Sequence, residues 1–254
     1  MRSSGGSPNT AFAAALLGAV VLALLALPAL RSTAAARTEA TASAGAGPLL
    51  IDGRRGGNHV RVWMSANGKR IAIRGNVHVK APHRCKHMRH HTRFRCRANG
   101  VTSVLVSLGG AGDKLEILDS LPVSVTAHLG AGRDKMIGAG EADICFPGPT
   151  RRNRCIGGAG NDVCVTGPRN SDCVGGPGND YCEASTGSDG CWGGSGQDVC
   201  KMGPGHDGCH GEGGDDQLFG GSSSDKLYGG PGRDYCDGQR GVGRSYSCEA
   251  GPRH

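Results

Sequence analysis

Aspartate recurs in this chain at a fixed spacing, always after a run of glycine. GGAGNDVCV at 157–165 returns eighteen residues later as GGPGNDYCE at 175–183, with a degraded copy between them. In the pattern of nine, glycine fills the first, second and fourth places, aspartate the sixth and a small or apolar residue the eighth. Glycine permits positive φ and close approach of main chains, so carbonyl oxygens and a carboxylate can converge on one point. Several oxygen ligands at one site suit Ca²⁺ rather than a transition metal.

The aspartates fall into two columns if two units make one winding of a stack that rises by about 4.8 Å per winding. The first column is unbroken, whereas the second starts with Asn153 and Ser171, beside Arg151 and Arg169 in the fourth place. This spacing allows up to five sites in the first column and two in the second. The expected calcium ligands are the first column (Asp143, Asp162, Asp180, Asp198, Asp216, Asp234), the second column (Asp189, Asp207, Asp225), an earlier pair (Asp113, Asp134) and the backbone of Gly157, Gly175, Gly193, Gly211 and Gly229.

The N-terminus has the layout of a secretory signal. An uncharged apolar run at 11–30 follows a short leader with Arg2, and A-x-A sites end at Ala36 or Ala42. We expect 1–36 to be a cleaved signal peptide, which leaves a secreted, extracellular chain without a membrane span. Retention by an uncleaved N-terminal membrane anchor is the alternative, because about twenty apolar residues can span a bilayer.

Twelve cysteines accompany the repeats. An even number in a secreted chain with few core residues indicates disulfides, and no C-x-x-C spacing of a zinc or redox site occurs. The eighth places should point into a thin core from alternate sheets, so pairing is open to neighbours across the core or to neighbours in one sheet. Same-sheet Cβ atoms lie about 4.8 Å apart, longer than the roughly 3.8 Å of a disulfide, which favours the cross-core pairs. The favoured set is Cys85–Cys96, Cys145–Cys155, Cys164–Cys173, Cys182–Cys191, Cys200–Cys209 and Cys236–Cys248.

These residues require a scaffold that stacks nine-residue units. Forty-six glycines and only 4% aromatic residues exclude a large globular core. We therefore expect an all-β fold, a parallel β-roll of two sheets over 108–237, in which each unit is a turn followed by a very short strand. Alternating apolar residues and Asn-Gly turns predict a small antiparallel β unit at 59–107 that contains the Cys85–Cys96 loop. A flexible linker is expected at 37–58 and a polar tail at 238–254.

The net charge of +7 is unevenly distributed. Residues 37–155 carry 20 Lys and Arg against 8 Asp and Glu, and residues 156–254 carry 7 against 14. The basic segment 83–97 suggests either a site for an anionic envelope or surface polymer, an adventitious metal site at His87, His90 and His91, or a solvated loop closed by a disulfide. A single aromatic residue in this segment is too little for nucleic-acid stacking. The candidate polyanion contacts are Arg84, Lys86, Arg89, Arg93, Arg95 and Arg97.

The units resemble the RTX, or haemolysin-type, calcium-binding nonapeptide repeats. The units that start at Gly157, Gly175, Gly193 and Gly229 match the family pattern at three glycines and one aspartate. The resemblance covers 108–237 and implies a parallel β-roll that binds Ca²⁺ outside the cell. The chain departs from it in two respects: cysteine replaces the usual Leu, Ile, Val or Phe, and the signal is N-terminal where many RTX proteins have a C-terminal one.

No catalytic motif accompanies these repeats. The sequence contains no H-E-x-x-H and no G-x-S-x-G, and the segment 37–107 is too short for the protease or lipase domain that RTX repeats often accompany. Because the aspartates recur every nine residues, we interpret them as structural ligands rather than as acid–base pairs. We therefore expect a calcium-binding protein that is not an enzyme. The alternatives are an accessory or toxin-like surface protein that docks on an anionic partner through 83–97, and a small hydrolase with an unrecognised site.

Overall fold

The computed structural model describes residues 46–80, 85–88, 92–118, 120–150, 152–240 and 244–249. The chain divides into two units, Met1–Ala42 and Ser43–His254, and all described residues belong to the second. The expected signal peptide at 1–36 therefore lies outside the described residues. Within the described ranges, no helix has the length and apolar character needed to cross a membrane.

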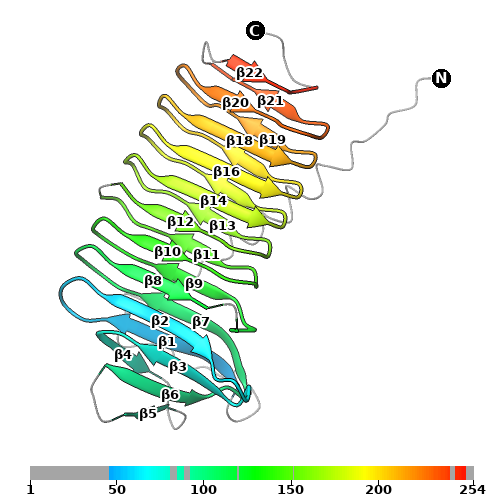
Figure 1. Ribbon diagram of the computed structural model, residues 1–254. Helices are drawn as coiled ribbons and strands as arrows, with labels where there is room; N and C mark the ends of the chain where they lie inside the picture. Colours follow the sequence, from blue (N-terminus) through cyan, green and yellow to red (C-terminus); the bar gives the residue numbers. More distant parts are fainter. Residues whose placement is uncertain are drawn as a thin grey trace, which may run out of the picture. The chain divides into compact units, whose positions relative to one another are not determined.

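Two facing sheets form a parallel β-solenoid, as expected (Figure 1). The ten-stranded sheet has the order β21 (Tyr235–Asp237), β19 (Gln217–Phe219), β17 (Val199–Lys201), β15 (Tyr181–Glu183), β13 (Val163–Val165), β11 (Ile144–Phe146), β9 (Val125–His128), β7 (Val101–Ser107), β1 (Gly47–Gly53) and β4 (Val77–Lys80). The twelve-stranded sheet has the order β22 (Arg244–Tyr246), β20 (Lys226–Tyr228), β18 (Gly208–Gly213), β16 (Gly190–Ser195), β14 (Asp172–Pro177), β12 (Arg154–Ile156), β10 (Lys135–Ile137), β8 (Lys114–Ile117), β2 (His59–Met64), β3 (Arg70–Arg74), β6 (Arg93–Arg97) and β5 (Cys85–His87).

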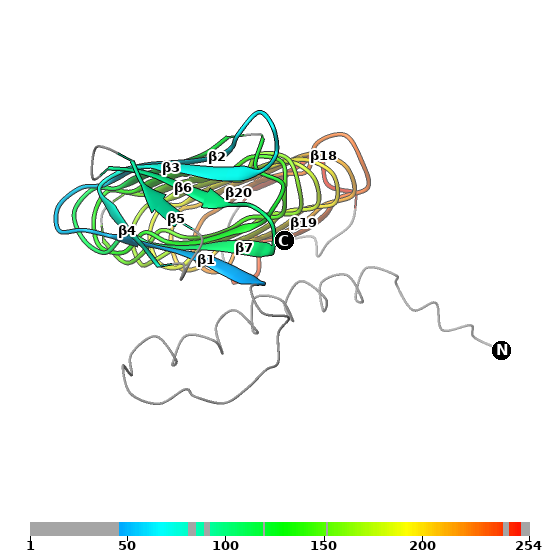
Figure 2. The same cartoon turned by 90° about the horizontal axis from the view of Figure 1, so that it is seen from below.

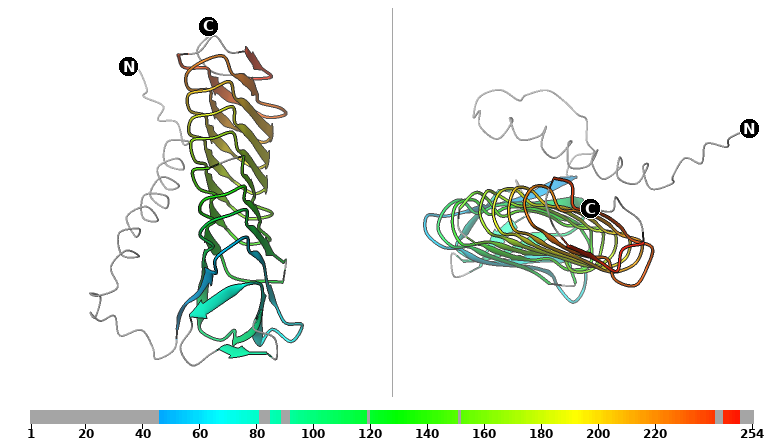
Figure 3. Two further views of the ribbon diagram at one scale, coloured as in Figure 1. Left: turned by 90° about the vertical axis from the view of Figure 1, so that its left-hand side faces the viewer. Right: turned by 90° about the horizontal axis from the view of Figure 1, so that it is seen from above.

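Successive units alternate between the two sheets, so each strand pairs in parallel with the strand one winding away, and from β12 and β13 onward this distance is eighteen residues. Cys164 lies opposite Cys182 in one sheet and Cys173 opposite Cys191 in the other. Turns superpose along the two edges of the stack (Figures 2 and 3). Glycine is needed in these turns because the second and fourth places have positive φ, for example 111° at Gly158 and 117° at Gly160.

The core between the sheets changes composition along the stack. Aliphatic residues such as Leu49, Val60 and Leu115 fill its beginning. From Cys145 onward the eighth places fill it with cysteine, as expected, and Leu218 and Leu227 resume the aliphatic core near the end. Cysteine is small, so the two sheets of the second half enclose little apolar volume.

The expected boundaries at the N-terminal side were wrong. The segment 47–53 is not a linker: it is the strand β1, which pairs in parallel with β7 and buries Leu49 and Ile51. The expected small antiparallel β unit is present, but the segment 59–107 is continuous with the windings, because β2 pairs in parallel with β8 and β7 with β9. Antiparallel pairing is confined to β1–β4, β2–β3, β3–β6 and β5–β6 in the described chain. The windings therefore begin at β1, and the antiparallel strands extend their first turn.

Candidate metal centre

The six aspartates of the first column form one stacked line, as their spacing predicts. Each lies at the end of a loop that leaves the twelve-stranded sheet, directly before a strand of the ten-stranded sheet. The backbone N–H of each aspartate except Asp234, the last, donates to Oδ1 of the aspartate one winding further on. The N···O distances are 2.7 Å for Asp143–Asp162, Asp162–Asp180 and Asp180–Asp198, 2.8 Å for Asp198–Asp216 and 3.0 Å for Asp216–Asp234.

In all of these side chains except Asp143, the second carboxylate oxygen has no hydrogen-bond partner. Asp162, Asp180, Asp198, Asp216 and Asp234 are all at most 5% exposed, and Oδ2 of each is buried without a hydrogen bond. A buried anionic oxygen of this kind is costly unless a cation or donor satisfies it. The same free oxygen recurs in five successive windings, from Asp162 to Asp234, which points to one kind of ligand along this part of the column.

The first-place glycines leave room beside these oxygens. A Cβ atom added to Gly175, Gly193 or Gly211 would overlap Oδ2 of the aspartate in the same unit and would crowd the backbone carbonyl of the glycine one winding further on. The space that the absent side chain leaves is therefore bordered by a carboxylate and a carbonyl oxygen. These are the ligands that Ca²⁺ takes. Gly157 and Gly229, the other two glycines expected to contribute backbone, also lie against the carboxylates of their own units, at Asp162 and Asp234.

Burial raises the pKa of the aspartates in both columns. The pKa is raised to about 7 at Asp162 and Asp216 and to about 8 at Asp180, where the charges of Asp162 and Asp198 add to the effect of burial. Each N–H donor from the previous winding lowers the pKa but does not cancel the cost of burial. The column therefore disfavours its own ionised form when no cation is bound.

Asp143 is the first aspartate of the first column and differs from the other members. Its Oδ1 accepts the N–H of Val125 at 2.8 Å and its Oδ2 accepts the N–H of Ala139 at 3.2 Å. Both oxygens are thus engaged by backbone donors. Val125 stands in the place of the preceding aspartate, so the column has no carboxylate beyond Asp143. Among the six, Asp143 is the least suited to a cation.

The second column is longer than expected, because Asp113 and Asp134 belong to it. The N–H of Asp113 donates to Asp134 at 2.7 Å, and that of Asp134 donates to Asn153 Oδ1 at 2.8 Å. The line begins at Asn58, whose N–H donates to Asp113 at 2.6 Å. The repeat pattern does not reveal Asn58, because this residue precedes the first glycine-rich unit. At the other end, the backbone N–H groups of Ser171, Asp189 and Asp207 donate to the next aspartate of the column, ending at Asp225.

The second column differs from the first at the first place of its units, although Oδ2 of its carboxylates is also buried without a partner, at Asp113, Asp134, Asp189, Asp207 and Asp225. The first place of its units holds Thr166, Ala184 and Met202, all buried, and Ala184 and Met202 pack with the core cysteines. Gly220 has the same place beside Asp225, and a Cβ added to it would lie 2.9 Å from Asp225 Oδ2. Ala184 and Met202 carry a real side chain in that position. The units of Asp189 and Asp207 thus carry a side chain at the place where the first column has glycine.

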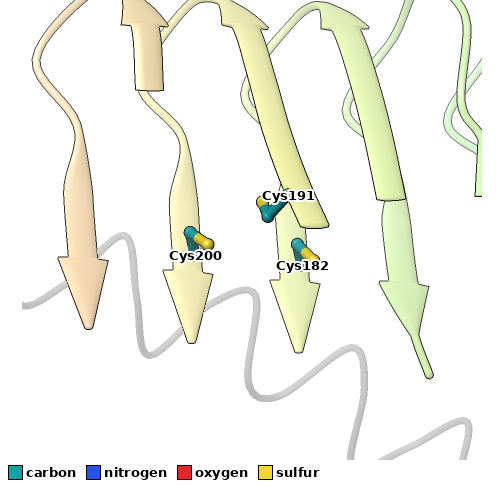
Figure 4. A group of neighbouring side chains, drawn as sticks. All are labelled: Cys182, Cys191 and Cys200. Carbon is teal, nitrogen blue, oxygen red and sulfur yellow. The ribbon is translucent and has the colours of Figure 1, made fainter. Parts of the chain in front are cut away.

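Five of the six expected cysteine pairs are bonded: Cys85–Cys96, Cys145–Cys155, Cys164–Cys173, Cys200–Cys209 and Cys236–Cys248. The sixth is not, because Cys182 and Cys191 are free thiols in the core. Figure 4 shows Cys191, from the twelve-stranded sheet, between Cys182 and Cys200 of the facing sheet, and the three sulfur atoms lie within 4.8 Å of one another. Cys191 therefore faces two equivalent partners, one of which is already bonded to Cys209.

The basic segment is partly described. Arg84 and Arg89 lie outside the described residues, as do His90 and His91, whereas Lys86 is exposed on β5. Arg93, Arg95 and Arg97 are exposed on β6, and the residues between them, Phe94 and Cys96, are buried. The arginines are thus the outward half of an alternating strand, which accounts for their exposure without a ligand.

Fold and site together define a class: a parallel β-solenoid whose glycine-rich turns stack buried carboxylates along its edges. The family model for the RTX calcium-binding nonapeptide repeat, in four copies, matches residues 174–200 and 210–243. The chain thus contains RTX calcium-binding nonapeptide repeats, which confirms the resemblance of its units to that family. No curated protein and no solved structure matches the chain.

Proposed function

We propose that this protein is secreted and binds calcium ions along the first column of its solenoid. The observation that carries the proposal is the buried, unpartnered Oδ2 that Asp162, Asp180, Asp198 and Asp216 each direct at a glycine in the first place. Carboxylate and carbonyl oxygens line that space, and the chain carries the repeat of a calcium-binding family. When bound, Ca²⁺ would supply positive charge to a line of carboxylates that burial otherwise holds partly protonated.

The N-terminal sequence and the bonded cysteines both support secretion. An apolar run with A-x-A sites is typical of an exported chain, and bonded cysteines are typical of oxidising compartments. Extracellular calcium is millimolar in many environments, so sites of modest affinity would be filled only after export. The chain's own residues then act as a scaffold: the backbone of one winding holds the carboxylate of the next in place.

The aspartates have structural partners that suit ligands better than catalysts. Every carboxylate of the first column accepts a backbone N–H from the neighbouring winding, and the arrangement repeats without a distinct pair. We therefore propose a binding protein rather than an enzyme. Docking of 83–97 on an anionic polymer is the less favoured alternative, since the described arginines of β6 are accounted for by strand alternation.

Calcium uptake by the mature, oxidised protein tests the proposal. Isothermal titration with calcium, and with magnesium as the control cation, should show several calcium ions per chain and weak or no magnesium binding. In Asp198→Asn the uptake should fall, because the amide keeps the hydrogen bond from Asp180 but lacks the charge. A wild-type chain that takes up no calcium at millimolar concentration would show the proposal to be wrong.

A further inference from the structure

The segment 244–249 continues the windings, although 238–254 was expected to be a tail outside the roll. The strand β22 pairs in parallel with β20, so that Tyr246 lies opposite Tyr228. The N–H of Gly229 donates to the carbonyl of Tyr246 at 3.0 Å, just as the N–H of Gly157 donates to the carbonyl of Val174 within the repeat. Cys248 bonds to Cys236 and fastens the segment to the end of the core. The last glycine-rich loop is therefore covered by chain that is not a nonapeptide.

Ser247 supplies the carbonyl that a first-place glycine supplies elsewhere. A Cβ added to Gly211 would crowd Asp216 Oδ2 and the carbonyl of Gly229, and one added to Gly229 would meet Asp234 Oδ2 and the carbonyl of Ser247. Ser247 has φ of 51°, the left-handed conformation that glycine adopts most readily. The space beside Asp234 is thus bordered by the same two kinds of oxygen as the spaces inside the repeat.

Glu249 takes the part of the next aspartate of the column. The N–H of Asp234 donates to Glu249 Oε2 at 2.7 Å, and the N–H of Glu249 donates to the carbonyl of Asp234 at 3.1 Å. In the repeat, the first of these bonds goes to the aspartate eighteen residues on, but position 252 holds proline. Asp234 is 0% exposed and its Oδ2 has no partner. A second carboxylate therefore lies beside a buried carboxylate that lacks a counter-charge.

We propose that 244–249 completes one more calcium site at the end of the first column, with the carboxylates of Asp234 and Glu249 and the carbonyl of Ser247 as its ligands. This proposal deepens the proposed function and rests on it, since it needs the column to bind calcium. It goes beyond the repeat because neither Ser247 nor Glu249 belongs to a nonapeptide. The disulfide at Cys248 then has a specific role, because it holds two ligands of the terminal site in place.

Calcium stoichiometry of two variants of the full oxidised chain tests the terminal site. Glu249→Gln keeps an oxygen that accepts the N–H of Asp234 but removes the charge, so we expect the chain to bind one calcium ion fewer, or to bind its weakest ion at least tenfold more weakly. Asp52→Asn is the matched control, because it removes one negative charge from β1 at the opposite end of the windings, where Asp52 pairs with Lys80. The control should bind as many ions as the wild type.

The outcomes separate this proposal from the proposed function. If Glu249→Gln binds as many ions as the wild type with unchanged affinity, the terminal site is refuted and the calcium column stands. If the wild type itself binds none, both are refuted. Glu249→Ala, which also removes the hydrogen-bond acceptor, adds a second measurement: a loss of stability equal in chelator and in calcium would mean that Glu249 only caps the column, whereas a larger loss in calcium supports the site.

Discussion

Replacing Asp162 by asparagine should stabilise the calcium-free protein at pH 8, although it removes an expected calcium ligand. Asp162 is 5% exposed, and burial raises its pKa from 3.8 to about 7. A carboxyl whose folded pKa lies above its unfolded value gives stability that is complete below the unfolded pKa and is lost as the pH rises through the folded pKa. At pH 8 the ionised side chain thus costs the folded form about 4 kcal/mol, from about three pKa units at about 1.4 kcal/mol each.

Asparagine avoids this cost and keeps the contact that holds the winding. Its Oδ1 can still accept the N–H of Asp143, which donates to Asp162 at 2.7 Å. We expect Asp162→Asn in chelator at pH 8 to be more stable than the wild type by up to about 4 kcal/mol, and the difference to shrink below about 1 kcal/mol at pH 4, where the folded wild type is protonated. Adding calcium at a hundred times its Kd should stabilise the variant by about 2.7 kcal/mol less than the wild type, the contribution of one lost site.

Urea denaturation followed by circular dichroism, at pH 8 and pH 4 and with chelator or calcium, measures these differences. Asp52→Asn is again the control, since Asp52 makes an exposed ion pair with Lys80 and its loss should change stability by less than about 1 kcal/mol. A calcium-free Asp162→Asn that is no more stable than the wild type at pH 8 would refute the reasoning, because the column would then carry no electrostatic cost for calcium to remove.

Three further changes test other parts of the structure. Gly193→Ala should weaken calcium binding at least tenfold at one site, because the methyl group would overlap Asp198 Oδ2 and crowd the carbonyl of Gly211; unchanged titration isotherms would argue against the glycine space as the site. Glu212→Gly should stabilise the protein in urea by up to about 1 kcal/mol, since the φ of 73° at Glu212 costs a residue with a Cβ atom about 1–2 kcal/mol and the greater unfolded entropy of glycine offsets about half of that. Reduction of the disulfides in chelator should abolish the β-sheet circular dichroism that the oxidised, calcium-free protein retains, since each short crosslink contributes about 2–3 kcal/mol; an oxidised protein already disordered in chelator would contradict this.

The repeat could be predicted because the aspartates and the paired strands recur with the same spacing in the sequence. A spacing of eighteen residues between Asp162, Asp180 and Asp198 gives the column only if two units make a winding. The strands have the same period, since Cys164 lies opposite Cys182 in the parallel sheet. The inward direction of the cysteines followed from strand alternation. These predictions needed nothing beyond the local pattern, since each winding repeats the contacts of the one before it.

The ends of the solenoid could not be predicted by the same means, because they are built from residues that leave the period. β1 looks like part of a linker in the sequence, and only its pairing with β7 shows that it is the first strand of the windings. Asn58 and Glu249 stand at the two ends of different columns, and neither occupies the sixth place of a nonapeptide. Their roles depend on how the adjacent strands position them at the ends of the columns, which the sequence pattern does not specify. The sequence also does not reveal the free pair Cys182 and Cys191, because Cys191 lies near the sulfur atoms of both Cys182 and Cys200.

The two edges of each winding differ in the residue at the first place of the unit. Where the first column has Gly193 or Gly211, Oδ2 of the aspartate lies against the glycine, and no side chain from that place packs in the core. Where the second has Ala184 or Met202, the side chain joins the cysteines and adds apolar contact to a core that has little of it. The first place therefore adds apolar contact to the core at Ala184 and Met202, and leaves only backbone at Gly193 and Gly211. Under the proposed function, we expect the first edge to make stability depend on calcium, whereas the apolar contacts of the second edge persist without it.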